Sequence, residues 1–129
     1  MTRLCLALAA AITLAAPAFA ASAGRPQLQT FFQATIGADY QQKAFARVAR
    51  SWRQPAQPPQ VGKKTVVQAL ISRDGKLASA SVTTESGSKA WDAAALAAVK
   101  KAAPFDKLPS SFTLPTLEAH FHFEWAAGK

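Results

Sequence analysis

The stretch that decides the fold is Leu117-Glu118-Ala119-His120-Phe121-His122-Phe123-Glu124-Trp125. Apolar and polar residues alternate through it without a break, and side chains on a β-strand point to opposite faces in turn. One face therefore carries the apolar residues of the run, and the other carries its glutamates and histidines. We predict a strand with one buried face and one face in water, whose register in the sheet is fixed by this pattern.

The segments before this strand predict a sheet for it to join and helices to cover it. Apolar residues recur at helical spacing over residues 39–52, with Asp39 as the expected N-cap. Residues 64–72 and 77–84 are expected to be strands, joined by a hairpin turn over Arg73-Asp74-Gly75-Lys76. A second helix is expected after Ser88, a residue type that is favoured at the N-cap.

Together these elements predict a small α+β domain. We expect two helices packed on one face of a three-stranded antiparallel sheet, in the order helix, strand, strand, helix, strand. Three strands with a helical cover can be stable alone. The polar face of the final strand is expected to be open to solvent. Residues 21–38 are expected to form a tether or a short N-terminal turn, followed by the domain at residues 39–126.

The N-terminus has the layout of a secretory signal peptide. Arg3 precedes an apolar, alanine-rich run, and the small-residue segment Ala18-Phe19-Ala20 follows it. We expect residues 1–20 to be removed, and Cys5, the only cysteine, to be removed with them. The alternative is an uncleaved inner-membrane anchor, because residues 4–23 are almost long enough to span a bilayer. Alanine is a weak membrane residue, which favours cleavage.

Basic residues dominate the charge of the chain, which is +8 at pH 7. Four of them fall on one stripe of the first predicted helix: Lys43, Arg47, Arg50 and Arg53. The stripe is either the solvated face of an amphipathic helix or a face that binds anions. In an exported protein such charge favours anionic surfaces or acidic proteins as partners. We do not expect nucleic-acid binding, because the aromatic residues of this helix belong to its buried face.

No set of residues predicts catalysis, a cofactor or a metal. The chain contains neither a G-x-S-x-G elbow nor a phosphate loop, so we do not expect an enzyme. His120 and His122 form an H-x-H pair between Glu118 and Glu124, which could supply zinc ligands or a pH-sensitive surface. We expect no metal site, because glutamates farther along a strand need not converge on the same ion.

Several short segments together resemble the C-terminal domain shared by TonB and TolA family proteins. The matching residues are Tyr40, Val48, Trp52 and Pro55; Asp74-Gly75; Ser86-Gly87; Trp91-Asp92 with Ala94-Ala95-Leu96 and Ala98-Val99; Pro104-Phe105; Leu108-Pro109; and the closing aromatic strand. The resemblance covers about residues 39–126. It implies a periplasmic protein-interaction domain, linked to outer-membrane transport or envelope integrity, that grips partners partly by strand addition at an exposed sheet edge.

We therefore expect the final strand, residues 117–125, to be the edge that binds a protein partner. Main-chain hydrogen bonds would supply affinity there, and alternate side-chain pockets would supply specificity. The same edge could exchange strands between two copies and give a homodimer. Full-length energy transducers of the family have a long spacer, whereas residues 21–38 reach only about 60 Å when fully extended. A free periplasmic module is expected, with a membrane-anchored TonB-like transducer as the alternative.

Overall fold

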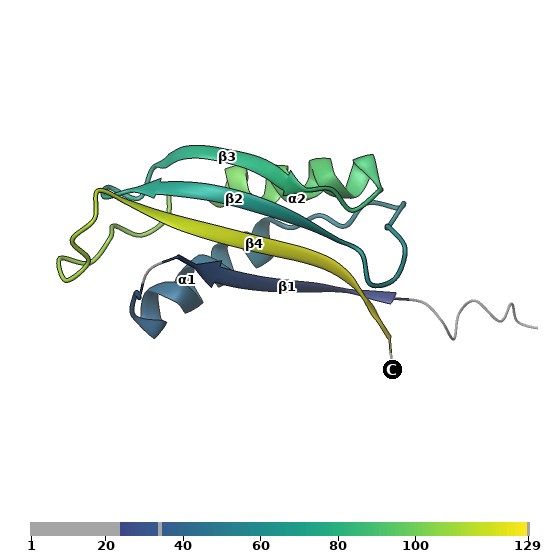
Figure 1. Cartoon of the computed structure of the whole chain (residues 1–129), viewed down its shortest axis with the longest axis horizontal. Helices are drawn as coiled ribbons and strands as arrows, with labels where there is room; N and C mark the ends of the chain where they lie inside the picture. The colour runs from purple at the N-terminus through teal and green to yellow at the C-terminus, as the bar shows by residue number, and fades with distance from the viewer. Residues whose placement is uncertain (1–23, 34, 129) are drawn as a thin grey trace, which may run out of the picture.

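The computed structural model describes residues 24–33 and 35–128. Six elements follow one another along the chain: β1 (Gly24–Phe32), α1 (Ala38–Ser51), β2 (Lys64–Ser72), β3 (Leu77–Thr84), α2 (Lys89–Ala102) and β4 (Thr116–Ala127). The strands form one antiparallel sheet in the order β1-β4-β2-β3. Both helices lie behind this sheet in the view of Figure 1. The predicted α+β class, with two helices on one face of an antiparallel sheet, is confirmed.

The described sheet has four strands, where we predicted three. The additional strand is β1, which lies where we expected a tether or a turn. It pairs antiparallel with β4 along its whole length, from Gly24 opposite Ala127 to Phe32 opposite Ala119. Pro26 and the glutamines of β1 obscured its alternation in the sequence. The predicted signal peptide lies outside the described residues and stays a prediction.

The hydrophobic core lies between the sheet and the helices, and the aromatic face of β4 is its centre. Leu117, Ala119, Phe121 and Phe123 are all buried, while the polar residues between them are half-buried on the opposite face. The alternation in the sequence therefore predicted the two faces of β4 correctly. Trp125 lies nearer the end of the strand and is half-buried.

The first helix, α1, begins at Ala38, two positions earlier than a cap at Asp39 would place it. Gly37 is the N-cap and makes no side-chain hydrogen bond, and Asp39 lies inside the first turn. A carboxylate in that position still interacts favourably with the positive end of the helix dipole. Tyr40, Ala44 and Val48 form the buried stripe of α1, as their helical spacing predicted.

The second helix, α2, is capped by Ser88 as predicted, since Ser88 Oγ accepts a hydrogen bond from the Trp91 backbone N–H at 3.2 Å. Asp92, in the first turn, does more than face the helix dipole. Its Oδ1 accepts hydrogen bonds from the Thr65 hydroxyl and from the backbone N–H and hydroxyl of Ser86. Thr65 and Ser86 are both buried. Asp92 therefore satisfies buried donors and joins α2 to the start of β2.

The hairpin between β2 and β3 holds the long loop that follows α2. Gly75 has a φ of 88° and donates its N–H to the Ser72 carbonyl at 2.9 Å. The Gly75 carbonyl accepts a hydrogen bond from the Phe105 N–H at 2.8 Å. Arg73 donates from one nitrogen to the carbonyls of Phe112 and Leu114, at 2.6 Å and 2.8 Å. These bonds fix the start of β4 relative to the hairpin.

Candidate functional site

The strand predicted to bind a partner, β4, is not a sheet edge in this structure. It pairs with β1 on one side and β2 on the other, so the edges of the described sheet are β1 and β3. The prediction was wrong on this point because β1 was not recognised as a strand. If β1 were absent, β4 would be the edge that we expected. The way in which β1 covers β4 therefore decides whether β4 can bind another segment.

The backbone groups of β4 divide between its two neighbours. On the β1 side, the Gln33 N–H donates to the Glu118 carbonyl at 3.0 Å. On the β2 side, the Trp125 N–H donates to the Lys63 carbonyl at 3.0 Å. Backbone groups of successive residues in an antiparallel ladder point to opposite sides. The even-numbered residues of β4 therefore direct their N–H and C=O groups to β1, and the odd-numbered residues direct theirs to β2.

β1 is held by this ladder and by a small number of side chains. None of its residues is fully buried. Leu28 and Phe32 pack against the core from the helix side. Phe31 lies on the open face, where it is 51% exposed and its ring centroid is 4.6 Å from that of His122. Pro26 occupies a position whose backbone nitrogen points away from β4, so its missing N–H removes no ladder bond.

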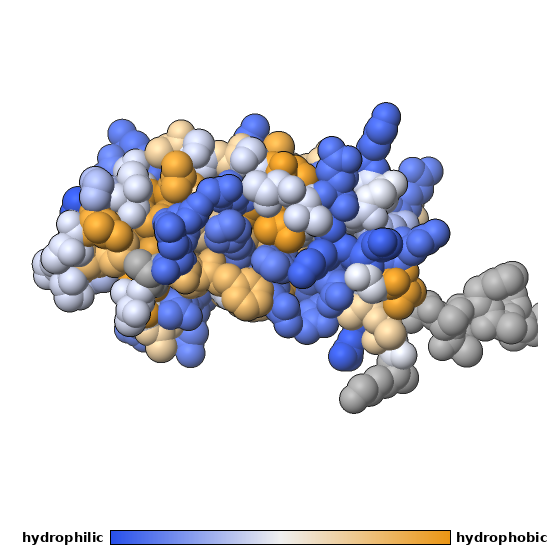
Figure 2. Space-filling view, viewed as in Figure 1, coloured by the Kyte–Doolittle hydropathy of each residue, from blue (hydrophilic) through white to orange (hydrophobic). Residues whose placement is uncertain are grey.

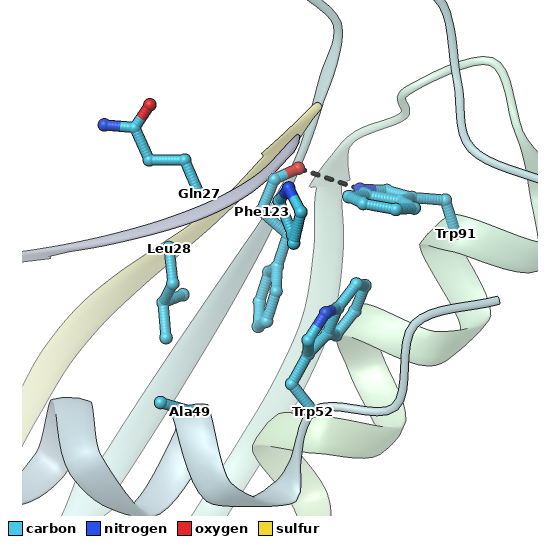
Figure 3. A pocket seen from close by; sticks show the side chains of 7 residues that line it. Gln27, Leu28, Ala49, Trp52, Trp91 and Phe123 are labelled. Atoms are coloured by element: carbon cyan, nitrogen blue, oxygen red, sulfur yellow. Dashed lines mark hydrogen bonds between the residues drawn. The ribbon is translucent and has the colours of Figure 1, made fainter. Parts of the chain in front are cut away.

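A small apolar cavity of about 140 Å³ lies under β1, between the sheet and the helices. Its lining residues come from β1, α1, α2, β4 and the residue after α1: Pro26, Gln27, Leu28, Ala49, Trp52, Trp91 and Phe123. Figure 3 shows Leu28 pointing from β1 toward Ala49 of α1, while Gln27 points away from the cavity. The cavity thus lies directly against the docking side of β4.

Tryptophan rings form the inner wall of the cavity. Trp52 packs against Trp91 in an edge arrangement, with ring centroids 4.9 Å apart, and against Phe123 at 5.0 Å. Trp91 Nε1 donates to the Phe123 carbonyl at 2.9 Å, as the dashed line in Figure 3 shows. Trp52 Nε1 is different: it is buried and has no hydrogen-bond partner among the described residues. An unpaired buried donor costs about 1–3 kcal/mol, so an acceptor brought to this wall would be stabilised.

The four polar residues of β4 lie on the open face of the sheet, as predicted. Figure 2 shows that face, which is largely hydrophilic with smaller apolar areas between. Glu118 accepts a hydrogen bond from Gln68 Nε2, and its Oε1 is 3.8 Å from His120 Nε2. Burial lowers the pKa of His122, and the charges of Lys64 and His120 lower it further, with Glu124 opposing. Across residues 24–33 and 35–128, no three His, Cys, Asp or Glu residues converge to hold a metal ion.

The basic stripe of α1 is divided in the structure. Arg47 binds the Asp106 carboxylate at 2.7 Å, and Lys43 lies 3.8 Å from the same group. Arg50 and Arg53 donate instead to backbone carbonyls near the end of the helix. Part of the predicted anion-facing stripe is therefore engaged with a carboxylate of this chain. Anion binding by the stripe stays a prediction, which we now restrict to Arg50 and Arg53.

The Asp106 cluster predicts a measurable pH dependence through Tyr40, the only tyrosine of the chain. Its hydroxyl donates to the Asp106 carbonyl at 2.9 Å. Burial, followed by the Asp106 carboxylate, raises the pKa of Tyr40 from 10.0 to about 12, and Arg47 opposes this shift. A pKa that is higher in the folded protein means that Tyr40 contributes stability below pH 10 that is lost as the pH rises through about 12.

Ultraviolet absorbance of the tyrosinate should therefore show the native Tyr40 titrating well above an unfolded control. Urea denaturation over the same pH range should show stability falling, and Tyr40→Phe should remove part of that fall. At neutral pH the same variant should lose about 1 kcal/mol, the contribution of one hydrogen bond. An equal fall with pH in Tyr40→Phe would contradict the assignment.

Within the described ranges, no helix has the length and apolar character that crossing a membrane requires.

Comparison with known proteins places the matched region between α1 and the last buried residue of β4. The family described as TonB C terminal matches residues 37–123, a range that leaves β1 outside. No curated protein matches the chain. A similar solved structure is the solution NMR structure of TolAIII bound to a peptide derived from the N-terminus of TolB, with 27% sequence identity and a TM-score of 0.48. The similarity covers 64% of this chain and 63% of that chain, less than two thirds of its length. Because the family match extends over more than half of the sequence, this chain belongs to the TonB C-terminal family.

Proposed function

We propose that this protein is a periplasmic protein-interaction module, which binds an extended segment of a partner protein by adding it as a strand beside β4. The observation that supports this proposal is the position of β4 within the family-matched region. In residues 37–123, β4 has β2 as its only strand neighbour. Its other side presents alternating backbone donors and acceptors next to an apolar cavity. Strand addition uses such backbone groups for affinity and such a cavity for specificity.

A binding role suits the cavity better than a catalytic one. Its lining residues include no acid, base or nucleophile, and of the two buried indole nitrogens in its wall, Trp52 Nε1 is the one without a hydrogen-bond partner among the described residues. Catalysis would need a nucleophile, a base and an orienting group directed at one point. The proposed periplasmic location rests on the signal-peptide pattern of residues 1–20 and on the family. The role in outer-membrane transport or envelope integrity is likewise proposed from the family.

A pair of substitutions at His122 tests strand addition. The His122 N–H faces the β1 side, so His122→Pro removes one main-chain donor there and spares the β2–β4 ladder. His122→Ala removes the same imidazole and keeps the N–H. Both substitutions are made in the full chain with Gln29→Pro, which weakens the pairing of β1 with β4, so that the lost donor affects the partner and not β1 equally. Partner proteins should be captured from the envelope of the native host at least about tenfold less by the chain with His122→Pro, since one lost hydrogen bond and the added ring bulk weaken main-chain pairing. The chain with His122→Ala should stay within about threefold of the chain that carries Gln29→Pro alone.

The comparison is informative only if both variants fold, which circular dichroism and the thermal unfolding transition would show. Equal capture by the proline and alanine variants would contradict docking beside β4. The remaining edge of the described sheet, β3, would then be the place to search for strand addition.

A further inference from the structure

We infer that β1 is a resident stand-in for the partner segment. In this inference, β1 occupies the docking side of β4 in the resting protein, its side chains show what kind of segment fits there, and a partner must displace it to bind. The inference rests on the proposed function and deepens it, because it assigns a partner chemistry and an internal competitor to the same site.

The pairing of β1 with β4 is complete. β1 matches β4 residue for residue from Gly24–Ala127 to Phe32–Ala119, without a register shift. The β2–β3 pair, by contrast, shows shifts at two places. β1 therefore already forms with β4 the strand pairing that strand addition by a partner would form. It lies outside the family-matched residues 37–123, so the matched domain has its core without it.

β1 contributes little to the core. None of its residues is buried, whereas β2 buries most of its helix-facing side chains. Leu28 and Phe32 are only partly buried where they contact the core. An incoming strand would restore the same backbone hydrogen bonds that β1 gives up. The exchange therefore depends on side-chain fit and on the tether, which holds β1 at an effective concentration on the order of millimolar.

β1 fills its site beside β4 incompletely. The cavity of about 140 Å³ remains beneath Leu28, and Trp52 Nε1 in its wall has no acceptor in the part of the chain that the structure describes. A partner segment with a larger side chain at this position, or one that carries an acceptor, would make contacts that β1 does not make. This gives a foreign segment a physical basis for displacing a tethered one.

The contacts of β1 indicate what kind of partner fits. The partner is an extended protein segment that runs antiparallel to β4 and whose side chains alternate between the helix-facing side and the open side of the sheet. Apolar side chains are needed at the positions of Leu28 and Phe32, which face the helices. A glycine fits at the position of Gly24, because the indole of Trp125 lies where a Cβ would stand. The intervening residues face the open side and can be polar. The predicted pattern is a glycine, an apolar residue four positions later and an aromatic residue four positions after that.

A disulfide between β1 and β4 tests whether β1 must leave. Gln33 and Glu118 are hydrogen-bonded across the ladder. Gln29 and His122 also lie opposite each other, four residues farther along each strand, so they form the same type of hydrogen-bonded pair. The Cα atoms of such a pair are about 5.5 Å apart, within the range that a disulfide spans. The test protein is the full chain with Gln29→Cys and His122→Cys, in a Cys5→Ser background. Oxidation locks β1 in place, and reduction of the same molecule is the control.

A second test opens the site instead of locking it, with one variant that weakens the pairing of β1 with β4 and one matched control. Gln29→Pro removes a backbone donor that faces β4, whereas Thr30→Pro places the ring at a position whose N–H points outward. The probe for all variants is a labelled synthetic peptide with the sequence of Gly24–Phe32. If β1 covers the site more than nine-tenths of the time, Gln29→Pro should bind this peptide at least about tenfold more tightly than the unchanged chain. Thr30→Pro should remain within about threefold of the unchanged chain.

The oxidised lock should abolish peptide binding, and reduction should restore it to the level of the unchanged chain. Equal binding by the oxidised and reduced forms would overturn the inference, while the His122 comparison would still decide the proposed function. A folded Gln29→Pro variant that binds no peptide would also overturn it, again without deciding partner capture. A covalent dimer formed by the cysteine pair would show that β1 of a second copy occupies the site. That result would overturn the inference in favour of strand exchange between two copies.

Discussion

Replacement of Trp91 by alanine is expected to lower the free energy of unfolding by about 3–5 kcal/mol. The Trp91 side chain is completely buried, and its ring packs at 4.9 Å from that of Trp52 and 5.6 Å from that of Trp125. Truncation would leave a large cavity where the two helices and β4 meet. It would also leave the Phe123 carbonyl without the indole donor at 2.9 Å. Since small domains have a total stability of about 5–15 kcal/mol, this variant should be close to unfolding.

Urea denaturation followed by circular dichroism measures this effect, and Trp91→Phe is the matched control. Phenylalanine keeps most of the apolar volume and removes the indole N–H. Its expected loss is smaller, about 0.5–1.5 kcal/mol for one hydrogen bond, because the Phe123 carbonyl still faces its ladder partner on β2. Equal losses in the two variants would mean that ring packing contributes little, contrary to the described core.

Replacement of Gly75 by alanine should cost about 2–5 kcal/mol, for two separate reasons. The φ of 88° at this turn is unfavourable by about 1–2 kcal/mol for any residue with a Cβ. The added Cβ would also overlap the carbonyl oxygen of Phe105, in the loop after α2. That loop would have to shift, and overpacking of this kind costs about 1–3 kcal/mol.

Gly87→Ala separates these two contributions. Gly87 has a similar φ of 97°, but apart from its two chain neighbours no described residue lies within 4 Å of the position of its Cβ. It should therefore lose only the backbone contribution of about 1–2 kcal/mol in the same urea experiment. If Gly75→Ala and Gly87→Ala lost the same amount, the close contact between the hairpin and the loop would be contradicted.

The local features of this fold were predictable from the sequence because their causes are local. The alternation of apolar and polar residues in β4 predicts its two faces, and Ser88 predicts the start of α2. The neighbours of β4 could not be read in the same way, because a strand shows the same alternation whether it lies at an edge or in the centre. β1 was missed for a related reason. Its core-facing residues, Leu28 and Phe32, are separated by Thr30 and preceded by Pro26, so the pattern is weak.

The candidate site depended on contacts between segments far apart in the sequence. Trp52 lies at the end of the first predicted helix and packs against the core, yet the lack of a partner for its Nε1 among the described residues follows from how α1, α2 and β4 meet. The cavity has the same origin, since its volume is what these elements leave unfilled. The pairing of Arg47 with Asp106 joins residues 59 positions apart, and nothing in the helical stripe indicated it. A single sequence shows the chemical type of such residues, but it does not show that they come into contact in the fold.

Amide hydrogen exchange along β4 of the unchanged chain tests most directly whether β1 is a removable cover. The amides of His120 and His122 face β1, whereas those of Phe121 and Phe123 face β2. If β1 detaches by local opening, the first pair should exchange at least about tenfold faster than the second after correction for intrinsic rates. Equally slow exchange of both pairs, matching the rate of global unfolding, would contradict the account. β1 would then be a permanent fourth strand, and β4 would have no side to offer a partner.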